Sequence, residues 1–204
     1  KKNYLIFTGV SCGHLIPAII LYEHLMDDAN VIISTDKRGL NYFDSSNYEC
    51  KIINTPKLNN ILLLPTNLIF VVFLTIKSFF YLKDKKIEKL FSTGGYMSLP
   101  LILAAKLLKI KIYLLEPNLV LGRANKFFLK SCVKIFCYSE KIKNYPIKYK
   151  NKMIIIFPLV KKKIYEINTI SFKHDELNLL IVGGSQGASV FDKNSKDKIV
   201  SISK

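Results

Sequence analysis

The sequence contains no tryptophan, few acidic residues, and four cysteines that form no recognisable motif. The cysteines stand at positions 12, 50, 132 and 137, without a CxxC pair or a His/Cys cluster with zinc-like spacing, which excludes the common zinc and dithiol motifs. We therefore expect reduced, structural thiols of a cytosolic protein, with Cys12 as an exception because of where it lies. The first residues also lack the charged, apolar and cleavage regions of a secretory signal.

Acidic residues are outnumbered by 31 Lys and Arg to 15 Asp and Glu, a formal net charge of +16. This excess suggests an anionic partner, which could be nucleic acid, an anionic membrane surface or a phosphorylated substrate. The alternative is a compositional bias, because lysine, isoleucine and asparagine are all abundant. The sequence shows no RNP, helix-turn-helix or zinc pattern, so we do not expect a nucleic-acid-binding protein.

A long uninterrupted apolar run is also missing. The segment ILLLPTNLIFVVFLTIKSFFYL, residues 61–82, is uncharged until Lys77 but is interrupted by Pro65, Thr66 and Asn67. A bilayer span needs roughly 20 apolar residues, so we do not expect one here. The segment instead predicts a helix from near Pro65 to the basic stretch at 83–86. That helix is either a buried layer of the fold or lies in a membrane interface, with its lysines at the headgroups.

Strand-like and helical segments alternate along the chain. Strands are predicted at 4–8, 30–34, 51–54, 88–92, 110–115, 133–138 and 152–157, and helices at 15–27, 66–87, 98–108 and 121–131. This order predicts an α/β domain with a doubly wound parallel sheet over residues 1–160. The polar stretch 161–176 follows as a linker. Residues 177–204 then begin a second Rossmann-like domain, which is incomplete within these 204 residues.

Three glycine turns follow predicted strands, in FTGVSCGHLIPAI (7–19), STGGYMSLP (92–100) and GGSQGAS (183–189). Ligands of parallel sheets bind beyond the carboxyl ends of the strands, and a helix that starts there, such as one from about Leu15, favours an anion. The spacing matches neither GxGxxG nor the Walker pattern, so it names no nucleotide class. One such loop could be a plain tight turn. Three of them favour a ligand whose phosphates bind at more than one point.

Four motifs together resemble the MurG family of UDP-N-acetylglucosamine transferases. They are Gly9-Val10-Ser11-Cys12-Gly13-His14 with Pro17-Ala18, Thr93-Gly94-Gly95-Tyr96-Met97-Ser98 with Pro100, Glu116-Pro117-Asn118 with Gly122 and Asn125, and Gly183-Gly184-Ser185-Gln186-Gly187-Ala188. The resemblance implies an inverting glycosyltransferase of the GT-B type, without a catalytic metal or a cofactor. Such enzymes convert lipid I to lipid II in peptidoglycan synthesis, and so serve cell-wall biogenesis, cell shape and cell division.

The resemblance also implies the partners and the residues that bind them. The acceptor is an undecaprenyl-diphosphate-linked muramyl peptide, bound by a peripheral enzyme at the anionic cytoplasmic face of the plasma membrane. Its implied diphosphate-binding residues are Gly9, Gly13, His14, Thr93, Gly94, Gly95 and Tyr96. The residues implied for the donor, UDP-N-acetylglucosamine, are Ser11, Cys12, Gly13, Asn118, Lys161, Ser185, Gln186 and Gly187.

The sequence departs from the family pattern at several points. Val10 and Cys12 replace two glycines of the first loop, Leu115 and Pro117 replace a histidine and a glutamine, and Lys161 replaces an arginine. Most of the second domain is not in the sequence. We therefore expect a fragment, a shortened product or half of a split enzyme. The alternative is a non-catalytic subunit that binds the lipid-linked acceptor while a separate chain supplies the donor domain.

Transfer requires a group that takes the proton of the attacking sugar hydroxyl. His14 is the predicted base, because imidazole accepts a proton near neutral pH and the loop places it at the cleft. The alternative is a histidine that only caps or orients the helix start. Glu116 is either a second base or an orienting carboxylate. His24 and His174 are expected to be solvated or packing residues.

Overall fold

The computed structural model describes residues 1–9, 12–37, 39–42, 48–54 and 64–165. The chain divides into two compact units, Lys1–Ile167 and Asn168–Lys204. All described residues belong to the first unit. The predicted second domain at 177–204, with its glycine turn, lies outside the described residues. His174, which precedes it, also lies outside them.

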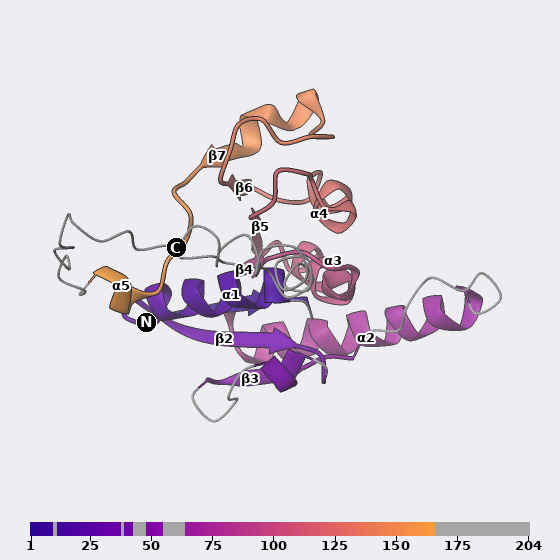
Figure 1. Ribbon diagram of the computed structural model, residues 1–204. Helices are drawn as coiled ribbons and strands as arrows, with labels where there is room; N and C mark the ends of the chain where they lie inside the picture. The colour runs from indigo at the N-terminus through magenta and orange to yellow at the C-terminus, as the bar shows by residue number, and fades with distance from the viewer. Residues whose placement is uncertain (10–11, 38, 43–47, 55–63, 166–204) are drawn as a thin grey trace, which may run out of the picture. The chain divides into compact units, whose positions relative to one another are not determined.

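The first unit is built on a seven-stranded parallel sheet (Figure 1). Its strands are β1 (Lys2–Phe7), β2 (Ala29–Thr35), β3 (Cys50–Ile52), β4 (Ile87–Ser92), β5 (Lys111–Glu116), β6 (Lys134–Cys137) and β7 (Met153–Ile155). The order across the sheet is β3-β2-β1-β4-β5-β6-β7, with every pairing parallel. The order reverses at β1, next to β4, which is where ligands of doubly wound sheets bind. All seven predicted strands are confirmed.

Helices cover both faces of this sheet. They are α1 (Cys12–Leu25), α2 (Leu64–Asp84), α3 (Leu99–Leu107), α4 (Arg123–Phe128) and α5 (Lys162–Tyr165), with 3₁₀ turns η1 (Gly39–Tyr42), η4 (Tyr96–Ser98) and η5 (Ile147–Lys152). Figure 1 shows α1 on one side of the strands, and α2 and α3 side by side on the other. The four predicted helices are present, but α1 begins at Cys12 instead of about Leu15. The helix therefore starts inside the glycine loop, and the loop itself is shorter than predicted.

The core forms on both sides of β1, because successive side chains of a strand point to opposite faces. Leu5 and Phe7 join the larger cluster, which α2, α3 and α4 cover. Tyr4 and Ile6 join the smaller cluster, which packs against α1. All four side chains are buried. The run Tyr4 to Phe7 is continuously apolar for this reason, as expected of a strand covered on both faces.

The predicted linker at 161–176 begins with a docked helix rather than an irregular stretch. Lys162, the first residue of α5, forms an ion pair with Asp27 just after α1, and α5 packs on α1. A ring nitrogen of His24 lies 3.0 Å from the carbonyl oxygen of Val160, and the rings of His24 and Tyr165 meet edge to face. His24 is thus a packing residue, one of its two predicted roles. The contacts explain why the first unit extends past the predicted boundary at 160.

The apolar helix α2 is only partly covered by protein. Within Thr66–Asp84, Val71, Ser78 and Leu82 are buried, whereas Ile69 and Phe80 are 71% and 63% exposed. The exposed large apolar side chains of this helix are Leu68, Ile69, Phe70, Val72, Phe73, Ile76 and Phe80. Length and composition alone would allow residues 66–84 to cross a membrane. The alternative of a buried layer helix therefore holds for one side of α2, whereas the other side is not covered by the described residues.

Candidate active site at the carboxyl ends of β1, β4 and β5

Two of the predicted glycine turns meet at the carboxyl ends of neighbouring strands β1 and β4. Gly94 and Gly95 have φ angles of +104° and +93°, a region that residues with side chains rarely adopt. A Cβ atom on Gly95 would lie 3.3 Å from the Cα of Gly9, and one on Gly94 would lie 3.1 Å from Cε1 of His14. The two turns are therefore in direct backbone contact, and the missing side chains make room for the His14 ring.

A cleft of about 720 Å³ opens above this contact. It is lined by His14 from the first turn of α1, by Gly94, Gly95 and Tyr96, and by Gly122, Arg123, Ala124 and Asn125 at the start of α4. Three chain segments that are far apart in sequence thus share one cavity. The structure brings together five of the predicted site residues here or at its floor: Gly9, His14, Gly94, Gly95 and Tyr96.

Glu116, the last residue of β5, forms hydrogen bonds with the third segment that lines the cleft, at the start of α4. Its carboxyl group is 1% exposed. One oxygen accepts hydrogen bonds from the backbone N–H and the side-chain amide of Asn118, at 3.2 and 3.0 Å. The other accepts from the backbone N–H of Gly122 at 2.8 Å and from Nδ2 of Asn125 at 3.0 Å. Four donors satisfy a buried carboxylate without a counter-ion, so Glu116 fixes the path of residues 116–125.

The same carboxylate affects a neighbouring thiol. Burial is the main cause that raises the pKa of the Cys137 thiol to about 12, and the neighbouring carboxylate of Glu116 adds to it. Burial also raises the pKa of Cys132 and of Cys50. All three are free thiols, as predicted, and they stay protonated at neutral pH. None of the three lines the cleft.

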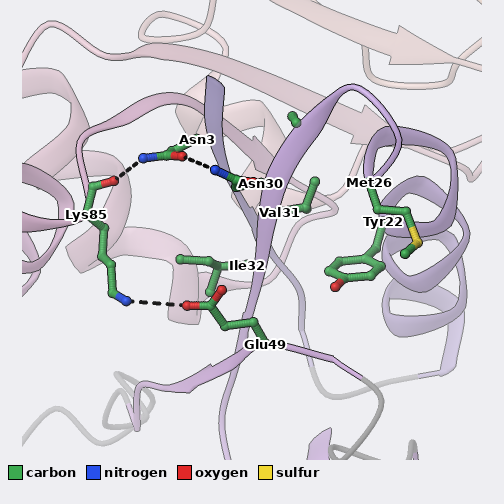
Figure 2. Close-up of a pocket in the computed structure, with 9 residues that line it drawn as sticks. Asn3, Tyr22, Met26, Asn30, Val31, Ile32, Glu49 and Lys85 are labelled. Atoms are coloured by element: carbon green, nitrogen blue, oxygen red, sulfur yellow. Dashed lines mark hydrogen bonds and ion pairs between the residues drawn. The ribbon is translucent and has the colours of Figure 1, made fainter. Parts of the chain in front are cut away.

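The cleft differs from a second pocket in whether its polar atoms have partners. Figure 2 shows that pocket, of about 400 Å³, at the amino ends of β1 and β2. There Asn3 donates to the Lys85 carbonyl, Asn30 donates to Asn3, and Lys85 pairs with Glu49.

In the cleft, by contrast, Nδ1 of His14, the Tyr96 hydroxyl and Oδ1 of Asn125 are buried without a hydrogen-bond partner among the described residues. Buried polar atoms normally find partners. The cleft, and not the pocket of Figure 2, therefore has the polar groups that a ligand would satisfy.

Comparison with known proteins agrees with this geometry. Residues 4–137 match the glycosyltransferase family 28 N-terminal domain. The chain belongs to this family. The match runs from β1 to the end of β6, and so contains every residue that lines the cleft.

Two curated relatives extend the family match. The chain is 49% identical over 205 residues to a UDP-N-acetylglucosamine–N-acetylmuramyl-(pentapeptide) pyrophosphoryl-undecaprenol N-acetylglucosamine transferase of Pelagibacter ubique, covering 100% of this chain and 58% of the relative. It is 34% identical to the protein of the same name from Prochlorococcus marinus, covering 95% of this chain and 54% of that relative. The chain thus spans somewhat more than half the length of these relatives. The resemblance to the MurG family is confirmed.

Solved structures confirm the fold class. MurG of Acinetobacter baumannii superimposes with a TM-score of 0.72 at 22% identity, over 96% of this chain and 56% of that one. A glycosyltransferase of Rickettsia africae gives a TM-score of 0.57 at 14% identity. The first unit is therefore the N-terminal, parallel-sheet domain of a GT-B-type glycosyltransferase.

The residues predicted for the donor are only partly described. Ser11, Ser185, Gln186 and Gly187 lie outside the described residues, as does the side chain of Cys12. Gly13 is exposed in the first turn of α1, and Asn118 is exposed beside Glu116.

Lys161 is not brought to the cleft. The preceding residue, Val160, contacts His24, which lies ten residues along α1 from His14, or about 15 Å at the rise of a helix. Among the described residues, no group of three His, Cys, Asp or Glu side chains could hold a metal ion.

Four residues that line the cleft have no predicted site role, and two of them, Arg123 and Asn125, have polar side chains. Asn125 is part of the third quoted motif, so its spacing from Glu116 was a usable signal. Arg123 is one of only two arginines in the sequence and stands between Gly122 and Asn125 of the same motif, so its position was also a usable signal. Its significance depends on the carboxylate network that places it.

Proposed function

We propose that this chain forms the acceptor-binding half of an inverting transferase that moves N-acetylglucosamine from UDP-N-acetylglucosamine to lipid I, producing lipid II. The observation that carries this proposal is the cleft over Gly94 and Gly95, which has the unpartnered Nδ1 of His14 in its wall. The names of the curated relatives supply the substrates. The family match supplies the class of reaction.

In the proposed reaction, an acceptor hydroxyl oxygen attacks the anomeric carbon of the donor sugar. The new oxygen–carbon bond forms as the bond from that carbon to the diphosphate breaks, and the electron pair leaves with UDP. The hydroxyl proton passes to the His14 ring, so charge and atoms balance. A buried ring nitrogen without a partner among the described residues suits this role better than one already bound to a cap position.

Glu116 is proposed as a positioning residue rather than a second base. Both of its oxygens already accept two hydrogen bonds each, from Asn118, Gly122 and Asn125. These four hydrogen bonds hold the carboxyl group in one orientation.

The exposed side of α2 supports peripheral binding at the cytoplasmic face of the plasma membrane. Its apolar side chains, including Ile69 and Phe73, would enter the interface between headgroups and acyl chains. Exposed lysines at 77, 83 and 86 would face the anionic headgroups. Such binding would place the cleft near a lipid-linked acceptor.

Transfer can be tested in a chimera in which this chain replaces the matching 205-residue region of the Pelagibacter ubique relative. We expect lipid II formation by the chimera, and a decrease in kcat of about 10²- to 10⁴-fold in His14→Ala, because that is the usual contribution of a general base. His24→Ala is the matched control on the same helix, and its kcat should stay within a few-fold. Unchanged turnover in His14→Ala would overturn the role of His14 as the base, and acceptor binding would then be the remaining proposed role of this chain.

Acceptor binding can be tested separately by calorimetric titration with a short-chain lipid I analogue. Gly95→Val should abolish binding, because the new side chain would be strained at a φ of +93° and would press against Gly9. Circular dichroism must show the variant folded. Equal affinity in a folded variant would contradict the placement of the acceptor at this turn.

A further inference from the structure

The cleft contains a cation whose charge is not neutralised. Among the described residues that line the cleft, Arg123 is the only side chain with a permanent charge. It is exposed, and it forms no ion pair within the described part of the chain. An arginine cannot lose its charge at physiological pH, so the cleft is locally positive.

The buried carboxylate of Glu116 accepts hydrogen bonds from residues on both sides of Arg123 in the sequence, but it forms no ion pair with Arg123 itself. Its Oε2 atom accepts from the backbone of Gly122, immediately before Arg123, and from Nδ2 of Asn125, two residues after it. A Cβ atom on Gly122 would lie 3.2 Å from this oxygen, so the close approach depends on glycine. The backbone at Arg123 is thereby fixed, while the guanidinium stays available.

Asn125 gives a second, independent indication of a ligand. Its Nδ2 donates to the Leu115 carbonyl at 3.2 Å and to Glu116, so the amide orientation is fixed by two acceptors. The remaining atom, Oδ1, is left buried without a partner among the described residues, although the residue is only 1% exposed and lines the cleft. This acceptor and the neighbouring cation fit a molecule that has both anionic oxygens and O–H or N–H donors.

We infer that Arg123 binds the diphosphate of the lipid-linked acceptor, with Glu116 as the residue that positions it. This inference rests on the proposed function, which supplies the diphosphate. A guanidinium forms two parallel hydrogen bonds with phosphate oxygens, whereas backbone N–H groups of the glycine turns supply only partial charges. Arg123 therefore provides the full positive charge that the glycine turns lack.

The test uses calorimetric titration of the 204-residue chain with a short-prenyl lipid I analogue and with the same muramyl peptide lacking the diphosphate. Arg123→Met should weaken binding of the analogue about 10- to 100-fold, the range for a lost charge-assisted interaction of this kind. Arg123→Lys should recover part of the loss. Binding of the peptide without diphosphate should not change. Lys126→Met, an exposed cation one turn along α4 that does not line the cleft, is the matched control and should stay within about two-fold.

The outcomes separate this inference from the proposed function. Equal binding of the analogue by Arg123→Met and the parent would overturn the role of Arg123 and leave acceptor binding intact. An equal loss for the peptide without diphosphate would also overturn it, because the effect would then come from loop shape. No binding of the analogue by the parent chain would instead contradict the proposed function. Unfolding temperatures of all variants should match, since Arg123 and Lys126 are both exposed.

Discussion

Helices α2 and α3 are both strongly apolar, pack against each other and cover the same face of the sheet, yet they use their apolar side chains differently. The helix α3 buries most of its apolar side chains, including Leu101, Ile102, Ala104 and Ala105. The helix α2 leaves seven large apolar side chains exposed. In Figure 1 its amino-terminal end projects past α3. The core accounts for the composition of α3 but not for that of α2.

This difference shows why hydrophobicity alone did not decide the role of residues 61–82. A helix that is apolar nearly all round can be buried on every side or can face lipid on one side. In the structure α2 is covered on the side that includes Leu82, which joins the main core cluster, and its large apolar side chains on the other side are exposed. An exposed apolar surface of this kind is typical of a protein–protein or membrane contact.

The largest expected effect comes from the buried helix. Leu101→Ala should lower the free energy of unfolding by about 2–5 kcal/mol, because Leu101 is fully buried in the main core. Ile69→Ala on α2 removes an apolar side chain that is mostly exposed, and should change stability by less than about 0.5 kcal/mol. Urea unfolding measures both. A loss of similar size in Ile69→Ala would mean that α2 is covered by protein.

The second effect concerns the exposed helix. Phe73→Ser should weaken association with anionic vesicles about 10-fold or more, since burying a side chain of this size contributes about 1.5–3 kcal/mol. Leu107→Ser, at a position also exposed but on α3, is the matched control and should bind as the parent does. Co-sedimentation with vesicles of stated composition measures this difference. Equal losses in the two variants would remove the distinction between the helices.

A smaller effect is expected from the lysines. Lys83→Gln, in the last turn of α2, should weaken vesicle binding about five-fold, because a basic residue near an anionic surface contributes about 1 kcal/mol. Lys106→Gln in the last turn of α3 should have little effect. The difference should vanish at high salt, where surface charge is screened. Parental binding that persists through high salt and an alkaline wash would indicate an inserted helix instead.

Much of the fold and part of the cleft could be predicted because they depend on local pattern. Apolar runs bounded by polar residues gave all seven strands, and the glycine turns at 9 and 94–95 indicated the edge of the sheet where the cleft forms. The carboxyl ends of parallel strands lie at the same edge of a sheet, so residues that follow several strands are expected to lie close together.

The remaining features depend on contacts between distant segments. Helix α5 stands in a polar stretch with no clear helical pattern, and its docking on α1 involves Lys162 with Asp27 and the Val160 carbonyl with His24. The carboxylate of Glu116 could have been a base or an orienting group until its four donors were located. Arg123 acquires its place only through that carboxylate. Contacts between residues so far apart in the sequence produce no periodic pattern from which they could be predicted.

The last expected effect is a dependence of stability on pH that appears only at alkaline pH, and it concerns the main core cluster that α3 covers. Cys137 belongs to this core, and its thiol has a pKa raised to about 12, whereas an unfolded chain would lose the proton near pH 8.5. Between these values the native state binds more protons than the unfolded state, so the free energy of unfolding falls as pH rises, by at most about 1.4 kcal/mol per pH unit. Below about pH 8 this contribution is fully present. Urea unfolding of the parent and Cys137→Ala at pH 7, 9 and 10.5 should therefore show a shallower decline in the variant. Cys50→Ala, at a half-buried thiol in β3, should alter the slope less, and equal slopes for the parent and Cys137→Ala would contradict the shift.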